Sequence, residues 1–528
     1  MSRAQFHLYN IVWLHNDCHS GENYGNHLQR VQRPCELWAE DKEFIVSPVS
    51  LNQPDALALA LGADLLVIIQ IAAVPLEALI RERRMLNRPT VYEINDDLAF
   101  AGNWLPADQG IRAALNRQHI LNLARACDAL QVSSSGLKKR YRSLHPEVFV
   151  LDPYVPVPHT APEKPSGFVI AWAGTSSHIA DLQTIIPAIN KFLRTHTDSR
   201  FVAMGNLGML EDLLQDLPAE QLQIRAFGNY EELQIFLAGA HIAIAPLKES
   251  GFNRGRSDGK FAQYAAAACV ALLSKCEVFA EHDKRALCFA SNHELEAHLE
   301  QLYAQRSQLN DIARPGWEWV IRDRSPQAVR EKMRLQFRRW MDSKTPLPKS
   351  DRIQVDPRQQ CIWAQALQAA KLAQRELCVE LCQSLLDMDI NFHSARWLLL
   401  QQLNGVQAYS KMLALIERAP RDTLFADHYA SMGYAIARKI KSEKMPVFLS
   451  KIQSPALRAQ TLGVGADGSE AYFRQILAEQ PYHYFALFGL HKLLQKHNAH
   501  HPDIPELLQR MDLLAPEALT TRKNLIAD

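Results

Sequence analysis

Short apolar runs alternate with helix-length amphipathic segments through the first part of this chain. Within residues 1–155 the apolar runs predict strands, and helices fit between them, for example at His27–Glu40 and Ile111–Ala126. Apolar strands that alternate with helices form a mostly parallel sheet covered on both faces. The predicted strands are His7–Leu14, Glu43–Val46, Leu65–Gln70, Thr90–Glu93, Ala129–Ser133 and Val148–Leu151.

A proline-rich segment divides this pattern in two. The segment DPYVPVPHTAPEKP at Asp152–Pro165 cannot occupy a helix or a central strand, because proline lacks the backbone donor that both need. The alternation then starts again, so two successive α/β domains are predicted, at residues 1–155 and 156–345. Strands of the second domain are predicted at Phe168–Trp172, Arg200–Met204, Gln223–Ala226, Ile242–Ala245, Val270–Leu273 and Leu287–Phe289.

Strand signals stop beyond the second domain. The segment PLPKSDRIQVDP at Pro346–Pro357 is a predicted linker, and residues 358–528 are rich in Ala, Leu and Gln at helical spacing. Pro481 separates two amphipathic helices within Glu470–Leu494, which resembles a tetratricopeptide-type helix pair. No fixed repeat period can be traced, so helical repeats and an irregular helical bundle both fit this region.

Composition excludes several classes of protein. At 528 residues the chain is too long for one core, and its formal net charge of +1 gives no overall field for nucleic acid or an anionic membrane. None of the nine cysteines forms a CxxC pair or a zinc-type array, and no apolar stretch reaches about 18 residues. We expect a cytoplasmic protein without a nucleic-acid partner and with at most peripheral membrane association.

The segment Ile242–Ser274 carries the clearest functional signal. An apolar run ends in Ala-Pro, and a polar loop and a helix follow, with Arg254, Arg256, Asp258 and Lys260 inside seven residues. Cations at a helix start just past a buried strand are what an open α/β sheet uses to hold an anion. A solvated surface loop is the alternative interpretation.

The helix start itself adds to this signal. Ser257 or Asp258 is a predicted N-cap, which places Lys260 in the first turn, with Gln263 and Tyr264 later on the same face. A lysine in the first turn opposes the helix dipole, and a bound phosphate would explain its placement. Either neighbouring arginine could grip the same phosphate through two hydrogen bonds.

A second turn points to the same edge of the sheet. The predicted strand FVIAW runs directly into Gly174, Thr175, Ser176 and Ser177, and a helix follows. Glycine permits close approach of the backbone to a ligand, and Ser176 or Ser177 could cap the helix. By itself the turn is a weak signal, because many strand–helix junctions contain a glycine and a serine.

Both segments resemble the donor-binding domain of GT-B glycosyltransferases, especially retaining enzymes of the large family-four type. The matching stretches are AWAGTSSHIADL and IAIAPLKESGFNRGRSDGKFAQYAA. Looser resemblances lie in the first domain, in TVYEINDDLAF at Thr90–Phe100 and DALQVSSSGLKKRY at Asp128–Tyr141. The resemblance covers about residues 5–340. It implies a GT-B fold, with two Rossmann-like domains facing a cleft.

The resemblance also implies a reaction and a site. A nucleotide-diphosphate sugar would serve as donor, without a separate cofactor or metal, and its sugar would pass with retention to a glycan, lipid-linked or protein acceptor. Lys260, with Arg254 or Arg256, would neutralise the diphosphate leaving group. The remaining implied donor-site residues are Gly174, Thr175, Phe252, Asn253, Ser257, Asp258 and Gln263.

One residue departs from the family pattern. Gln263 stands where the family has a glutamate that grips the ribose hydroxyls, and a neutral amide binds them more weakly than a carboxylate. Glu249 could compensate, or the domain could be a weakened, transferase-like scaffold. In that alternative, residues 358–528 would bind a protein partner on a concave helical surface.

Other polar residues of the first domain carry weaker signals. For Asp96 and Asp97 an acceptor-side or loop-structuring role is favoured over metal binding. Tyr24, Arg30 and Arg33 could face the cleft. His15 and His27 are expected to be structural.

Overall fold

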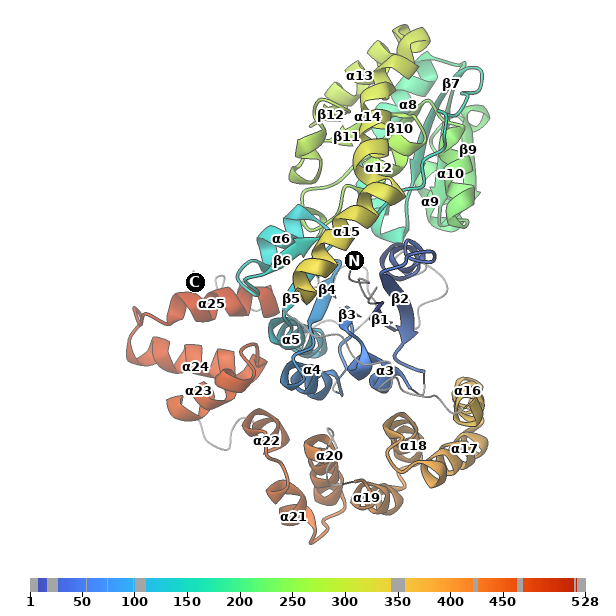
Figure 1. Ribbon diagram of the computed structural model, residues 1–528. Helices are drawn as coiled ribbons and strands as arrows, with labels where there is room; N and C mark the ends of the chain where they lie inside the picture. The colour runs from blue at the N-terminus through green and yellow to red at the C-terminus, as the bar shows by residue number, and fades with distance from the viewer. Residues whose placement is uncertain are drawn as a thin grey trace, which may run out of the picture.

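Two parallel sheets followed by a long helical region make up the protein (Figure 1). The computed structural model describes residues 8–16, 27–53, 55–73, 75–97, 99, 111–342, 357–420, 426–462, 469–516 and 519. Tyr24 and most of the predicted linker, residues 346–356, lie outside these ranges. No helix in the described ranges combines the length and the apolar character needed to cross a membrane.

The first sheet has six parallel strands in the order β2-β1-β3-β4-β5-β6. Every strand overlaps its predicted range, because buried parallel strands are continuous apolar runs. Side chains alternate between the faces, so Ile11 and Trp13 face one helical layer while Val12 and Leu14 face the other. The strands are β1 (Tyr9–His15), β2 (Phe44–Ser50), β3 (Leu65–Ile69), β4 (Thr90–Ile94), β5 (Ala129–Val132) and β6 (Val148–Val150).

The second sheet repeats this design in the order β12-β11-β10-β7-β8-β9. Helices α8 (Ile186–Thr195) and α13 (Asn292–Ala304) pack on one face. Helices α10 (Tyr230–Ala238), α12 (Gly259–Ala266) and α14 (Leu309–Arg324) pack on the other. The strands are β7 (Phe168–Ala173), β8 (Ser199–Gly205), β9 (Leu222–Ala226), β10 (Ile242–Ala245), β11 (Val270–Ser274) and β12 (Leu287–Phe289). The expected pair of Rossmann-like domains is confirmed.

Helix α15 (Pro326–Met341) follows the second sheet in the chain but packs on the first. Phe337 lies in one aromatic cluster with Trp13, and their ring centroids are 6.2 Å apart. Arg334 and Arg338 form ion pairs with Glu43 at the start of the first domain's second strand. The chain therefore crosses between the two α/β domains twice, and α15 fastens one to the other.

The segment after β1 differs from the predicted helix at His27–Glu40. It forms a π-helix η2 (Leu28–Gln32), then a short α2 (Arg33–Glu36), and it ends in turns. Pro34 has no N–H to bond the carbonyl of Arg30, so a regular α-helix cannot continue through this position. The free Arg30 carbonyl instead accepts a hydrogen bond from Trp13 Nε1 at 2.8 Å.

The C-terminal region is entirely helical in its described part and curves past the first domain (Figure 1). Pro481 lies between two helices, as predicted. The helices are α16 (Pro357–Lys371), α17 (Arg375–Met388), α18 (His393–Gly405), α19 (Tyr409–Glu417), α20 (Ala426–Lys439), α21 (Met445–Ser450), α22 (Pro455–Leu462), α23 (Glu470–Glu479), α24 (Tyr484–His497) and α25 (Ile504–Leu514). Most of these helices pack on the next helix along the chain, and α22 packs on α20 and α23.

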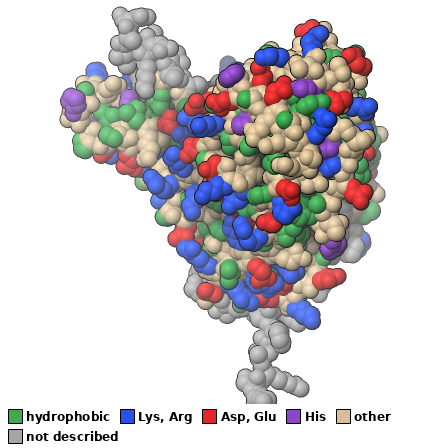
Figure 2. All heavy atoms as spheres, turned by 90° about the horizontal axis from the view of Figure 1, so that it is seen from above, with side chains coloured by type: hydrophobic (Ala, Val, Ile, Leu, Met, Phe, Trp, Pro, Cys, Tyr) green, Lys and Arg blue, Asp and Glu red, His purple; other side chains and the backbone are tan. Residues whose placement is uncertain are grey.

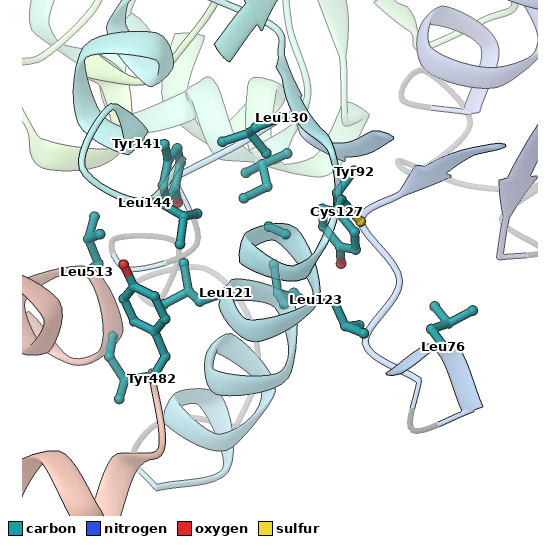
Figure 3. Close-up of a cluster of buried hydrophobic side chains, with 14 of the residues drawn as sticks. Leu76, Tyr92, Leu121, Leu123, Cys127, Leu130, Tyr141, Leu144, Tyr482 and Leu513 are labelled. Atoms are coloured by element: carbon teal, nitrogen blue, oxygen red, sulfur yellow. The ribbon is translucent and has the colours of Figure 1, made fainter. Parts of the chain in front are cut away.

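Both ends of the helical region are attached to the first domain. At the far end, Tyr482 and Leu513 lie beside Leu121 and Leu144 in one hydrophobic core (Figure 3). At the near end, Trp363 Nε1 on α16 donates to the Asn52 carbonyl oxygen. Because the helices share a core with the first domain, they are part of one structural unit with it rather than a tethered appendage.

Basic and acidic side chains are interspersed on the face shown in Figure 2, where Lys and Arg are numerous near the middle. Elsewhere on the protein, too, basic side chains form ion pairs with acidic ones, among them Arg322 with Asp323 and Lys332 with Asp152. Paired surface charges contribute little field at a distance, because salt screens them. A pocket lined by several cations and few carboxylates therefore differs from this mixed surface.

Candidate functional site

A pocket of about 320 Å³ lies between the carboxyl ends of the two sheets. We call it the cation pocket. The first domain contributes Leu28, Gln29 and Arg30 from η2, the residues after β4 and β5, and part of the proline-rich hinge. The second domain contributes the turn after β7, the residues around the start of α10, and the start of α12. Ligands of open α/β sheets bind at this edge.

The turn after β7 forms one wall of the pocket, and Gly174 is needed there for space. A Cβ at this position would lie 2.6 Å from the Trp172 ring and 3.1 Å from the His178 Cβ. The following residues form a 3-10 turn, Ser176–His178, and the predicted helix starts directly after it as α7 (Ile179–Leu182), with His178 instead of a serine at the N-cap and no side-chain cap bond. The Thr175 side chain bonds Ser177 at 3.0 Å and makes no cap bond to the backbone.

Lys260 enters the pocket from the first turn of α12, as predicted. Its Nζ donates to the Ala173 carbonyl oxygen at 2.5 Å, directly before the glycine of the turn. Burial, together with the nearby Arg256, lowers the pKa of Lys260 to about 7, while Asp181 acts in the opposite direction. An anion bound beside this lysine would favour its charged form, whereas the solvated loop lysine of the alternative interpretation would be charged without one.

Arg256 lies on the other side of the same turn. Its Nη2 donates to Ser177 Oγ at 2.9 Å, its guanidinium lies 4.7 Å from the Phe252 ring centroid, and its Nε is buried without a hydrogen-bond partner. Burial lowers the pKa of Arg256, and the carboxylates of Asp96 and Asp181 partly oppose that shift. Lys260 and Arg256 therefore bracket residues 173–177.

The other predicted cation, Arg254, is exposed and is not one of the described residues that line the pocket. The two arginines are two residues apart, at the end of the short helix α11 (Gly251–Arg254) and in the loop after it. Asn253 also lies outside the lining; its Nδ2 donates to Asp181 Oδ1 at 3.0 Å and to the Lys248 carbonyl at 2.9 Å. It supports the loop that carries the arginines.

Asp258 is the N-cap residue of α12, but its carboxylate makes no cap bond. It instead accepts from His282 Nε2 at 2.9 Å and from Arg324 Nη2 at 2.8 Å. Burial favours a raised pKa for Asp258, but these two partners outweigh it and lower the pKa. Asp258 thus anchors the start of α12, whereas Ser257 and Gln263 line the pocket as predicted.

A buried histidine–aspartate pair supports the site, and the sequence did not single it out. His178 lines the pocket, and its Nδ1 lies 3.1 Å from Asp181 Oδ2. Burial, together with Lys260 and Arg256, lowers the pKa of His178 well below its usual value, so the ring is neutral. Asp181, only 3% exposed, also accepts from the Lys248 backbone at 2.9 Å. The i,i+3 spacing in AWAGTSSHIADL is the signal that could have revealed the pair.

The first domain contributes a third cation, Arg30, which is 4% exposed. Its Nε donates to Glu93 Oε1 at 2.6 Å and its Nη1 to the Leu151 carbonyl at 3.0 Å, while Nη2 is buried without a partner.

The two aspartates after β4 differ in their surroundings. Asp96 lines the pocket, whereas Asp97 forms an ion pair with Arg140 at 3.2 Å, in the favoured loop-structuring role. Within the described residues, no group of three or more His, Cys, Asp or Glu side chains is placed to hold a metal ion.

The two domains touch on both sides of the pocket. Ser134 Oγ donates to the Gly255 carbonyl at 2.7 Å, and a Cβ at Gly136 would lie 2.1 Å from the Arg254 carbonyl oxygen. Opposite this contact, the Arg33 guanidinium lies 3.5 Å from the ring centroid of Tyr230, a pocket residue. Such contacts hold the cations of both domains around one space.

Comparison with known proteins places the fold in context. The sequence matches no protein-family model, and no curated protein matches it. Among solved structures, Anabaena HepE in complex with UDP-glucose is 12% identical, covering 62% of this chain and 99% of its own, with a TM-score of 0.47. An alpha-glucosyltransferase bound to UDP-glucose and DNA is 13% identical, with the same coverages and a TM-score of 0.45.

A third similar structure is a mutant of Staphylococcus aureus TarM in complex with Fondaparinux, alpha-GlcNAc-glycerol and UDP. It is 12% identical, with coverage of 53% of this chain and 59% of its own and a TM-score of 0.40. Identities and TM-scores this low assign no function to the chain. The proposals below therefore rest on its own residues and geometry.

Proposed function

We propose that the cation pocket binds a nucleotide-diphosphate sugar and that the protein transfers the sugar to an acceptor. One observation carries this proposal: Lys260 and Arg256 bracket the backbone of residues 173–177, on either side of the space that Gly174 leaves open. Two cations at one turn match the two negative charges of a diphosphate diester. Arg30, from the opposite domain, adds a third cation on the facing wall.

The chemistry of sugar transfer explains this arrangement. As the bond from the sugar carbon to the diphosphate oxygen breaks, negative charge grows on the departing nucleoside diphosphate. Lys260 and Arg256 stabilise that charge, because both cations lie at the turn beside the departing diphosphate.

The proposal has finer parts that rest on the sequence resemblance. The sugar passes with retention to a glycan, lipid-linked or protein acceptor, the reaction uses neither a metal nor another cofactor, and the protein works in the cytoplasm. We assign residues 358–528 a tetratricopeptide-like role in recognising the acceptor or a protein partner. In support of this role, both ends of the helical region are attached to the first domain, the domain that we take as the acceptor side.

A weakened, transferase-like scaffold is the second candidate, and Gln263 is the observation that favours it. This residue lines the pocket with a neutral amide where the resembling family has a carboxylate. The two buried cations of the pocket argue against the scaffold hypothesis. Burying Lys260 and Arg256 beside each other costs stability through desolvation and mutual repulsion, and a protein without an anionic ligand has no use for that cost.

Thermal denaturation with a panel of nucleotide sugars tests the proposal. UDP-, GDP- and dTDP-sugars are each added to the full chain, and the nucleotide released is then measured with and without candidate acceptors. We expect at least one donor to raise the Tm, because a ligand that binds only the folded state stabilises it. Stabilisation without any nucleotide release would favour the scaffold. No stabilisation by any donor would overturn donor binding altogether.

A further inference from the structure

A second cavity, of about 680 Å³, lies where the helical region meets the first domain. We call it the α16 pocket. The end of β1, the segment η2–α2, and β2 with the turn after it form three sides, and α16 forms the fourth. Its described lining residues are His15, His27, Val31, Gln32, Cys35, Glu36, Ala39, Val46, Pro48, Ser50, Asn52, Gln53, Trp363, Ala364 and Leu367.

The α16 pocket and the cation pocket share one element. Residues Leu28, Gln29 and Arg30 of η2 line the cation pocket, while Val31 and Gln32 of the same π-helix line the α16 pocket. Both pockets also take residues from carboxyl ends of strands in the first sheet, since His15 ends β1 and Ser50 ends β2. A ligand in the α16 pocket would therefore lie on the acceptor side of the donor.

The wall formed by α16 is firmly held. Trp363 is 4% exposed, donates to the Asn52 carbonyl, and packs against Phe392 of the next helices with ring centroids 5.6 Å apart. The helical region thus supplies a fixed surface of this cavity. Without α16 the remaining three sides would form an open depression at the edge of the sheet.

The chemistry of the lining selects a class of ligand. None of the described residues that line the α16 pocket is Lys or Arg, and Glu36 is its one carboxylate, so it has no attraction for phosphate or carboxylate groups. Val31, Cys35 and Leu367 provide apolar surface, and Gln32, Ser50 and Gln53 provide neutral donors and acceptors. A fatty chain would make no use of those polar groups, whereas a neutral ligand with several hydroxyls can bond them.

We propose that the α16 pocket binds a neutral saccharide, the end of a carbohydrate acceptor for the sugar transfer. The CH faces of a sugar ring pack on the apolar walls, and its hydroxyls bond the amide, hydroxyl and imidazole groups around them. The role of this saccharide as an acceptor rests on the proposed function, but saccharide binding itself can be measured without the donor. It also gives the helical region a direct part in the site.

A pair of matched variants tests the pocket in the full chain. Ala364→Trp adds an indole from an exposed position of α16 into the cavity, and Ala414→Trp makes the same change at an exposed alanine of α19 that lines neither pocket. Binding of uncharged methyl glycosides, disaccharides and trisaccharides is measured by calorimetry or saturation-transfer NMR. We expect Ala364→Trp to weaken saccharide binding by about tenfold or more through steric exclusion, with no change in Ala414→Trp.

A milder variant guards against a folding defect. Gln53→Ala, at an exposed position in the turn after β2, removes one amide and should weaken binding by about fivefold. The Tm and the circular dichroism of each variant are compared with those of the unchanged chain. Saccharide affinity that is the same in Ala364→Trp and Gln53→Ala as in the unchanged chain would overturn the assignment.

Other ligands provide further ways to overturn it. If no neutral saccharide binds, or if only a glucuronic-acid oligosaccharide, decanoate or an uncharged tripeptide does, the pocket does not take a neutral sugar. The donor panel is run on the same preparations. Saccharide binding lost in Ala364→Trp while no nucleotide sugar raises the Tm would support the α16 pocket and remove the transferase proposal. Donor binding without saccharide binding would support the transferase proposal and overturn the assignment of the α16 pocket.

Discussion

The cation pocket and the α16 pocket share a sheet edge and one π-helix but differ in charge and in origin. Three cations, Arg30, Arg256 and Lys260, line the first, against one carboxylate, Asp96. The second has neutral polar groups and apolar walls, with Glu36 as its one charged carboxyl group among the described lining residues. One space suits an anionic leaving group, and the other suits an uncharged hydroxyl-bearing molecule.

The difference teaches how one sheet edge can separate two kinds of ligand. Charged ligands are attracted over several ångströms, so an anion enters the pocket that three cations line against one carboxylate. Neutral ligands are selected by shape and hydrogen bonds, which act only at contact. The π-helix η2 lies between these two environments, and Pro34 and Trp13 hold it in place. The predictions below test whether the two pockets respond separately.

The largest expected effect is that of Lys260→Ala. Loss of a charge-assisted hydrogen bond to the diphosphate should weaken nucleotide-sugar binding by about 2.5 kcal/mol, or about 70-fold. Calorimetry on the full chain measures it. Lys191→Ala is the control, because Lys191 is an exposed helical lysine paired with Glu296 and lines neither pocket. Equal affinity in both variants would show that the diphosphate binds elsewhere. A loss of saccharide binding in Lys260→Ala would show that the two pockets do not bind their ligands separately.

The second effect concerns the turn that both cations bracket. Gly174→Ala forces a Cβ to within 2.6 Å of the Trp172 ring, and such overpacking should cost about 2 kcal/mol of folding stability along with donor binding. Gly208→Ala in α9 (Leu207–Leu214) is the matched control, since nothing lies within 4 Å of a Cβ there. Chemical denaturation compares the two. A Gly174→Ala protein as stable as Gly208→Ala would mean that the turn has room for a side chain.

The third prediction is a pH dependence confined to the cation pocket. The pKa of Lys260 is lowered to about 7, and its protonated form binds the diphosphate, so donor affinity should fall by about tenfold as the pH rises from 7 to about 8.3. A nucleotide sugar is the appropriate probe, because its diphosphate diester does not titrate in this range. Lys260→Arg keeps its charge and should show a flat profile. A flat profile in the unchanged chain, or the same slope for saccharide binding, would contradict this prediction.

The smallest expected effect tests the ribose end of the site. Gln263→Glu should tighten nucleotide-sugar binding by about fivefold if the side chain faces the ribose hydroxyls, because a carboxylate is the stronger acceptor. Comparison with the 2′-deoxyribose analogue of the same donor isolates that contact. The gain should vanish with the deoxy analogue. Weaker binding of both donors would place Gln263 near the phosphates instead, where an added negative charge repels them.

Much of the fold could be predicted from the chain alone. Each of the twelve strands of the two sheets overlaps its predicted range, and the signal is clearest for the central strands, which are buried on both faces and therefore mostly apolar. The helix at Ile111–Ala126 ends where predicted. The helix at His27–Glu40 does not, since its hydrophobic pattern continued through Pro34 while its hydrogen bonding could not. The domain boundaries at residues 155, 345 and 357 stay predictions.

The residues of the candidate site also fall into those that the sequence indicates and those that it does not. Lys260 and Gly174 were identified because their signals are local: a cation in a first helical turn and a glycine after a strand. The choice of Arg256 over Arg254 was not available, because the phase of a short helix decides which of two nearby side chains turns inward. Asp258 was predicted as a helix cap, but its carboxylate bonds His282 and Arg324, which lie 24 and 66 residues away in the chain.

The sequence by itself therefore determined the two parallel sheets, the helical region and the place of Lys260 in the first turn of a helix. Each follows from spacing within a short segment, where backbone geometry leaves few choices. Only the tertiary structure decided the neutral His178–Asp181 pair, the contribution of Arg30, and the α16 pocket. That last cavity joins His15 and Ser50 to Trp363, more than 300 residues along the chain. Contacts over such separations depend on how whole domains pack, and no local pattern encodes them.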